Sequence, residues 1–313
     1  MYPETNTSNL IDLDDQEALQ KLRTACKIAS QARDFGASLI KPGAKLIEIL
    51  DQVEEKIKKL GAQPGFPAQI NKNDIAAHYC SAYDDPEIVQ DNDIMKFDCG
   101  THVDGYMGDT ARTVYVGKDP HIEKLKQATK KALDNAVKHV KPGVTTGELG
   151  KIIGETITND GFKPVKNLSG HGLGRYVIHT SPSIPNFANQ GIQTLKAGMV
   201  IAIEPFASTG AGMIYEGNDA EVFMVVDKKP VRNLIVKQLV QDIDKFKGLP
   251  FAPRWLMQKH TPQKVLYVLN ELQKMDMIRA YPPLIDKDHG LVSQHEHTLL
   301  VTEDGCEVLT REV

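Results

Sequence analysis

One hairpin, at residues 94–116, constrains the fold of this chain most strongly. Two runs rich in β-branched and aromatic residues flank the dipeptide Asp104-Gly105, a combination typical of a tight turn between paired strands. Side chains alternate across a strand, so Asp98 and Asp109 fall on one face as diagonal neighbours. Gly100 lies opposite Asp109 in this register and leaves an empty space there. The hairpin is therefore predicted to bring two carboxylates together beside a gap.

Two carboxylates on one sheet face allow two interpretations. If water reaches that face, both acids are solvated and the hairpin is an ordinary exposed one. If the face is dry, the like charges raise the pKa of one acid or require a cation. The pair is then half of a metal site, and its remaining ligands lie further along the chain.

The order of the predicted elements repeats along the chain. Each half reads as a helix, Lys-Pro-Gly, a second helix that stops at a glycine, a loop and an apolar strand ending in an acid. The helices are predicted at 16–35, 46–60, 121–140 and 146–159, and the strands at 94–97 and 199–203. The acids that end these strands are Asp98 and Glu204. We predict an α+β fold of two related halves, and a pseudo-two-fold axis between them would bring both acids to the centre.

Residues 221–280 differ in character from both halves. They are helix-rich, carry many lysines and lack the repeat, so they are predicted to form a compact helical insertion. The chain then returns to the main body in a last long strand at 291–301. Alternation along this strand turns Glu296 inward and turns His295 and His297 away.

The composition is that of an ordinary globular protein, with 41% hydrophobic and 25% charged residues among 313. A net charge of −4 argues against a general nucleic-acid binder, which is normally basic. No apolar run is long enough to span a membrane, and the polar start of the chain lacks the apolar core of a signal peptide. The four scattered cysteines do not form a disulfide framework, so a reduced, cytoplasmic protein is expected.

Five side chains from distant parts of the sequence form a set of candidate metal ligands. They are Asp98, Asp109, His171, Glu204 and Glu296. Four carboxylates and one imidazole suit Mn, Fe(II) or Co better than a structural zinc. Because carboxylates bridge, the set can hold two divalent cations, an arrangement typical of hydrolases that include aminopeptidases. Each residue alone also has a plain structural explanation, and only the joint pattern predicts a metal centre.

Six motifs, in this order, resemble those of one enzyme family. They are Phe-Asp-Cys-Gly-Thr-His-Val-Asp-Gly, Gly-Asp-Thr-Ala, Ser-Gly-His-Gly-Leu-Gly, Ile-Glu-Pro-Phe, Tyr-Pro-Pro-Leu and Glu-His-Thr. From about residue 14 to its end the chain is similar to the type 2 methionine aminopeptidases of the pita-bread fold family. The resemblance implies two pseudo-two-fold related α/β halves around a central antiparallel sheet. The insertion at 221–280 resembles the feature that separates type 2 from type 1, and the lack of a long charged N-terminal extension resembles the archaeal form.

The resemblance also implies roles for the matching residues. All five candidate ligands match residues that hold two metal ions with a water between them, and Glu204 matches a proton shuttle as well. Five further residues match positions that contact the substrate: Phe66, His78, Ile178, His179 and Tyr281. The two histidines match groups that contact the peptide and the developing tetrahedral species. The other three match the pocket for the methionine side chain, whose thioether suits apolar walls.

The implied activity is removal of the initiator methionine from nascent polypeptides with a small second residue. A monomer is expected, and transient association with ribosomes is compatible with such a substrate. Two alternatives are a prolidase or aminopeptidase P, and a non-catalytic binding protein on the same fold. The first carry a separate N-terminal domain and lack the insertion, and the second have lost metal ligands that are all present here. Cys99 is expected to be a core thiol that faces away from the ligands, and His102 a hairpin-tip residue.

Overall fold

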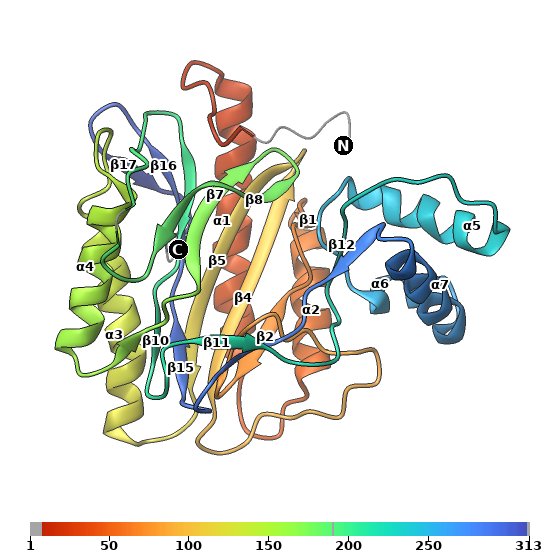
Figure 1. The fold of residues 1–313 in the computed structure, drawn as a ribbon, viewed down its shortest axis with the longest axis horizontal. Coiled ribbons are helices and arrows are strands. Elements are labelled where there is room, and N and C mark those ends of the chain that lie inside the picture. The colour runs from red at the N-terminus through yellow and green to blue at the C-terminus, as the bar shows by residue number, and fades with distance from the viewer. Residues whose placement is uncertain (1–7, 190, 312–313) are drawn as a thin grey trace.

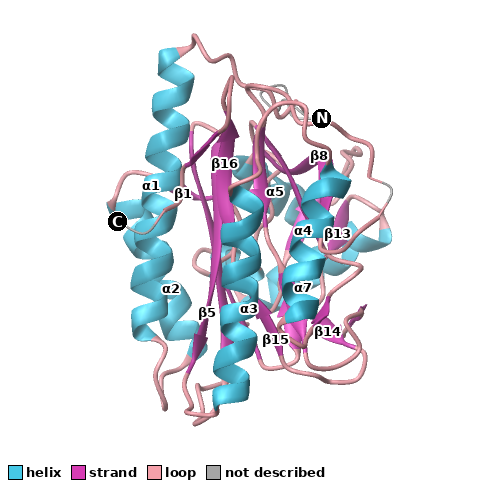
Figure 2. Cartoon of the chain, turned by 90° about the vertical axis from the view of Figure 1, so that its left-hand side faces the viewer, coloured by secondary structure: helices cyan, strands magenta, loops and turns pink. Residues whose placement is uncertain are grey.

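The strands of the computed structural model, which describes residues 8–189 and 191–311, gather at the centre of the molecule (Figure 1). Helices α1 (Gln16–Leu39) and α2 (Leu46–Lys59) lie behind them, and α3 (Pro120–Val137) and α4 (Thr146–Asn159) lie at the left. Seen from the side, β5 (Tyr106–Tyr115) and β16 (His297–Val301) run between α1 and α3 (Figure 2). The predicted α+β class is confirmed. In the described parts of the chain, no helix is long and apolar enough to cross a membrane.

The second half repeats the local structure of the first with residue numbers raised by 100. Gly43 and Gly143 both follow Lys-Pro and have φ of 84° and 90°, and Gly61 and Gly161 end α2 and α4 with φ of 94° and 89°. Only glycine adopts such angles without strain, so it stands at each of these turns. The short strands β1 (Gln63–Pro64) and β6 (Lys163–Pro164) then follow at equivalent places. These shared turns account for the repeat seen in the sequence.

The central hairpin pairs β4 (Ile94–Val103) with β5 in the predicted register. Gly100 lies opposite Asp109, and Asp104 and Gly105 form the turn with φ of 51° and 85°. Two successive left-handed residues match the right-handed twist of the flanking strands, which fixes the register. The sequence predicted an empty space over Gly100, and this prediction is wrong because the Phe66 ring fills that space. A Cβ on Gly100 would lie 2.2 Å from the ring.

The predicted last strand, 291–301, is interrupted. It forms β15 (Val292–Gln294), which pairs with β10 (Phe206–Ser208), and β16, which pairs with β9 (Val200–Ile203). Pro205 lies between β9 and β10 and has no amide hydrogen for the ladder. The two acids Glu204 and Glu296 therefore lie where both paired strands break, and Glu296 N–H donates instead to the Ala111 carbonyl of β5 at 2.9 Å.

The two halves are joined where β5 meets β16. Asp109 N–H donates to Thr298 Oγ1 at 2.8 Å, and that hydroxyl donates to the Asp109 carbonyl at 2.7 Å. Around this seam the other strands complete the sheets: β2 (Gln69–Lys72), β3 (Ile75–Ala77), β7 (Ser169–Gly174), β8 (Val177–Pro185), β11 (Ile214–Glu216), β14 (Leu284–Asp286) and β17 (Cys306–Val308).

The segment 221–280 lies on the right in Figure 1, on the side opposite α3 and α4. It contains α5 (Leu234–Ile243), a 3-10 turn (Asp244–Phe246), α6 (Pro253–Met257) and α7 (Pro262–Lys274) around an apolar core of its own. Two strands absent from the sequence prediction, β12 (Phe223–Val225) and β13 (Ile278–Ala280), pair and close the segment at its base. Arg254 of α6 connects it to α2, donating to Glu54 at 2.9 Å.

Candidate metal centre

All ten predicted site residues line one cavity of about 580 Å³ between the two halves. They are Phe66, His78, Asp98, Asp109, His171, Ile178, His179, Glu204, Tyr281 and Glu296. The elements that carry them come from both halves and from the chain that leaves the insertion. The structure therefore brings the whole set together, although these residues are up to 230 positions apart in the chain.

The candidate ligands converge around the imidazole of His171. His171 Nε2 lies 3.4 Å from Glu204 Oε1 and 3.7 Å from Asp109 Oδ2. Donor atoms of Asp109, His171 and Glu296 all lie within 4.8 Å of one another. His171 Nδ1 lies 3.2 Å from the Gly172 carbonyl, so the ring is held with Nε2 toward the acids.

Burial makes this concentration of negative charge costly. It raises the pKa of Asp98 to about 7 and raises that of Asp109 well above its usual range, where Asp98 adds to the effect. Burial also raises the pKa values of Glu204 and Glu296, and the neighbouring acids raise them further. The pKa of His171 is lowered, chiefly by burial, so its ring is neutral and free to act as a ligand.

One observation indicates that these residues fit a cation. Asp98 Oδ1 is buried and has no hydrogen-bond partner among the described residues. A buried carboxylate oxygen without a partner is costly unless a proton or a cation satisfies it. Four acids and a neutral imidazole with this geometry are a donor set for divalent ions.

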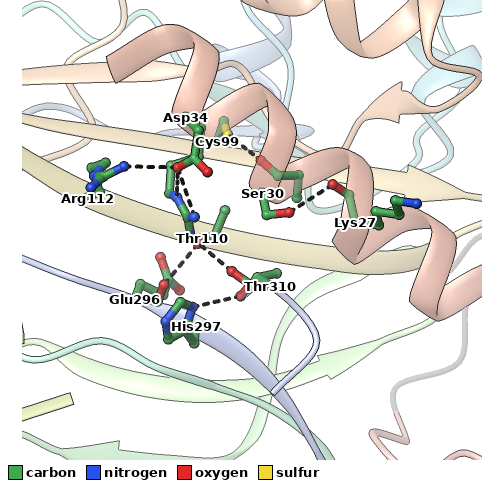
Figure 3. Close-up of polar contacts among 11 residues, drawn as sticks. Lys27, Ser30, Asp34, Cys99, Thr110, Arg112, Glu296, His297 and Thr310 are labelled. Carbon is green, nitrogen blue, oxygen red and sulfur yellow. Dashed lines mark hydrogen bonds and ion pairs between the residues drawn. The ribbon is translucent and has the colours of Figure 1, made fainter. Parts of the chain in front are cut away.

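A hydrogen-bonded layer supports the acids from behind (Figure 3). Arg33 of α1, which is 2% exposed, donates to Thr110 Oγ1 at 2.9 Å, and that hydroxyl donates to the Glu296 carbonyl at 2.9 Å. Cys99 lies on this side as well, buried with its Sγ 3.7 Å from the Ala29 carbonyl. The expected core thiol is thus found. Arg33 was not predicted as a site residue, although it lies four residues after Ala29 on the buried face of α1, which was the available signal.

The flanking histidines of the last strand point away from the cavity, as the alternation predicted. His295 Nδ1 lies 2.9 Å from Thr129 Oγ1 of α3, and His297 Nδ1 lies 3.0 Å from Thr310 Oγ1. Gln294 was not predicted as a site residue, yet its Nε2 donates to Glu204 Oε2 at 3.2 Å. It shares the face of Glu296 in the predicted alternation, which was the available signal.

Two further histidines and several apolar side chains line the same cavity as the acids. The rings of His171 and His179 are 4.3 Å apart, and those of His78 and Tyr281 meet edge to face at 5.9 Å. Burial lowers the pKa of His78 to about 4, although a hydrogen bond to the Pro282 carbonyl acts to raise it. The His78 ring is therefore neutral at pH 7. Phe66 and Ile178 are 6% and 4% exposed and belong to one apolar cluster. The cavity thus combines charged, polar and apolar walls.

The solved structures include close matches to this fold. The crystal structure of a methionine aminopeptidase from Thermotoga maritima has a TM-score of 0.71 and 24% sequence identity, covering 97% of this chain and 100% of that one. The structure of a thermophilic Arx1 has a TM-score of 0.82 and 16% identity, covering 96% of this chain and 91% of that one. At these identities the likeness concerns the fold alone, and it confirms the pita-bread architecture that the motifs implied.

The sequence comparisons identify the family. A protein from Archaeoglobus fulgidus, described as a methionine aminopeptidase, is 41% identical over 298 residues, which are 95% of this chain and 100% of that protein. The model of metallopeptidase family M24 matches residues 20–303, nearly the whole chain. The match spans every residue that lines the metal cavity. The chain belongs to metallopeptidase family M24.

Proposed function

We propose that this chain is a metallo-aminopeptidase that removes methionine from the N-terminus of polypeptides with a small second residue. The observation that carries the proposal is that all five candidate ligands line one cavity together with apolar side chains, and that donor atoms of three of them lie within 4.8 Å of one another. The relative from Archaeoglobus fulgidus, described by that activity, supports it over nearly the full chain.

Asp98, Asp109, His171, Glu204 and Glu296 would hold two divalent ions, and their oxygen-rich chemistry favours Mn, Fe(II) or Co. When bound, such ions lower the pKa of a water molecule and polarise a peptide carbonyl. The hydrogen bonds to the peptide groups of Asp109 and Glu296 hold these two acids in place. The charge of a bound ion would favour the ionised carboxylates against the effect of burial.

Three side chains near the cluster can act on the peptide. Glu204 holds one oxygen toward His171 and accepts from Gln294 through the other, so it can take up and return a proton. His78 and His179 line the same cavity and would donate hydrogen bonds to the scissile group and to the charge that develops on it. His78 is neutral at pH 7, so its ring has a single N–H. This N–H donates to the Pro282 carbonyl in this structure and would have to turn to the peptide.

The apolar wall selects the first residue of the peptide. Phe66, Ile178 and Tyr281 give the cavity apolar and aromatic surface. A flexible thioether adapts to such a wall, whereas a charged side chain would lose its hydration there.

The segment 221–280 acts in this proposal as the type 2 insertion, since Val222, Met224 and Pro250 of it line the same cavity. Its closing strands leave Tyr281 immediately outside the segment, beside His78. We also propose a cytoplasmic monomer that meets its substrate as the polypeptide leaves the ribosome. Four free cysteines support a reducing compartment.

The test uses protein stripped with a chelator and reloaded with Mn(II) or Co(II). We expect release of methionine from Met-Ala-Ser but not of alanine from Ala-Ala-Ser. The matched control is Asp109→Asn, which keeps the side-chain shape and should lower turnover by about 100-fold or more. Peptide binding without turnover under any divalent ion would favour the binding-protein alternative, and cleavage limited to Xaa-Pro bonds would favour a prolidase.

A further inference from the structure

The backbone of His78 has an uncommon conformation. Its φ is 68°, in the left-handed region, and among the described non-glycine residues with positive φ it alone lines the metal cavity. A residue with a β-carbon stays in this region only when its surroundings hold it there, and such outliers concentrate at functional sites. The contacts that hold His78 therefore matter for any role of its imidazole.

Two buried side chains of β2 provide these contacts. Gln69 Oε1 accepts from His78 N–H at 2.7 Å, and Asn71 Oδ1 accepts from Tyr79 N–H at 2.7 Å. Gln69 is 5% exposed and Asn71 is fully buried. Ile70 N–H, which lies between them in the chain, donates to the Tyr79 carbonyl at 3.2 Å. Side-chain oxygens thus replace the carbonyl partners that a regular strand would offer these two amides.

The same strand is the direct neighbour of a predicted metal-ligand strand. Gln69 lies opposite Asp98 in the pairing of β2 with β4, and Gln69 itself lines the cavity. Gln69 therefore connects the strand that carries Asp98 to the backbone of His78. The Nδ1 atom of the His78 imidazole is buried and has no hydrogen-bond partner among the described residues.

We propose that Gln69 and Asn71 are positioning residues, which fix the His78 imidazole relative to the acid cluster by holding its backbone in the left-handed conformation. The inference rests on the role of His78 in the proposed function. Gln69 acts directly on His78, whereas Asn71 acts one residue further along, so its contribution is the smaller one.

The test compares Gln69→Met, which keeps the length of the side chain and removes the acceptor, with Lys72→Met in the same strand. Lys72 points to the other face and pairs with Asp93 at 3.2 Å. We expect Gln69→Met to retain its metal and its KM within about threefold and to lose about 100-fold in kcat, the effect of misplacing an aligned group by about 1 Å. Lys72→Met should lower only the melting temperature.

A double-mutant cycle distinguishes positioning from general damage. In a His78→Ala background, Gln69→Met should change kcat by less than about twofold, because the group it positions is gone. An equal loss in both backgrounds, a loss of bound metal or an unchanged kcat would overturn the inference. If Gln69→Met does not fold, Asn71→Ala takes its place, with Asn71→Asp expected to restore activity because it keeps an acceptor oxygen at the position of Oδ1. Full activity of His78→Ala alone would instead overturn the role of His78 in the proposed function.

Discussion

At the scale of single residues, the protein places acids where water screens them only weakly. Burial raises the pKa of Asp98 to about 7, whereas in an unfolded chain an aspartate titrates near pH ~4. In the metal-free protein the folded state therefore binds more protons than the unfolded state between these values. This difference destabilises the folded state progressively as the pH rises.

The matched substitution is Asp98→Asn, which has no titrating group. We expect the free energy of unfolding of Asp98→Asn, relative to the natural chain, to increase as the pH rises from about 4 to 7 in the presence of a chelator. Buried histidines have lowered pKa values, which make the folded state more stable as the pH rises. This contribution is common to both proteins, so it cancels in the difference between their free energies of unfolding. Urea unfolding of both proteins at several pH values measures this difference. A difference that stays constant or falls as the pH rises would refute the expectation.

His78→Ala separates metal binding from catalysis. The side chain lines the cavity, but its Nδ1 lacks a described partner and it is not a member of the cluster around His171. We expect the variant to bind metal as before and to lose about 100-fold or more in kcat, the scale of a lost transition-state contact. Metal content by atomic spectroscopy and release of methionine from Met-Ala-Ser provide the two measurements. Loss of metal would contradict this role.

At the scale of elements, equivalent turns in the two halves should respond equally to mutation. A Cβ at Gly61 or at Gly161 would meet nothing within 4 Å, so an alanine there is opposed only by the backbone angle. We expect Gly61→Ala and Gly161→Ala each to lower the free energy of unfolding by about 1–2 kcal/mol.

Gly108→Ala is the contrasting case. Its φ is not in the left-handed region, but a Cβ would lie 2.7 Å from the Cα of Cys26, in the backbone of α1. The helix would have to move away from β5, and we expect a larger loss, about 3 kcal/mol. Equal losses for all three variants in urea unfolding would show that backbone angle and packing are not separated in this way.

A buried arginine, Arg254, attaches the insertion to α2 through the buried Glu54 and the more exposed Asp51. Arg254 donates to Glu54 at 2.9 Å, and the Trp255 indole N–H donates to the same carboxylate at 2.7 Å. Arg254→Met leaves Glu54 buried without its cation, which should cost about 3–5 kcal/mol, and adding Glu54→Gln should recover part of this loss. Trp255 is the only tryptophan of the chain, so its fluorescence reports on this junction. An unchanged emission transition in Arg254→Met would contradict the prediction.

At the scale of the whole molecule, features set by short-range rules could be predicted from the sequence. The hairpin register followed from Asp104-Gly105 and side-chain alternation, and α4 was predicted with both of its ends. The two related halves followed from turn signals that only glycine satisfies. The identity of the site residues depended on the resemblance, because no local pattern tells which distant strands meet.

Features that depend on another part of the chain were missed. The break in the last strand arises opposite Pro205 of its partner, and the pairing that closes the insertion joins Phe223 to Ala280. The Phe66 ring over Gly100 and the contact of Arg33 with Thr110 likewise join distant segments. Each depends on a tertiary contact between segments that are distant in the chain.

The recurrence of the same turns 100 residues apart has a consequence for the origin of the catalytic cleft. A chain of half this length, paired with a copy of itself, would place identical edges against each other at a two-fold axis. Joining the copies in tandem frees each to diverge, so that one can supply the carboxylates of the hairpin while the other supplies the imidazole. The asymmetry needed to bind a directional polypeptide thus becomes available within a frame whose turns still repeat.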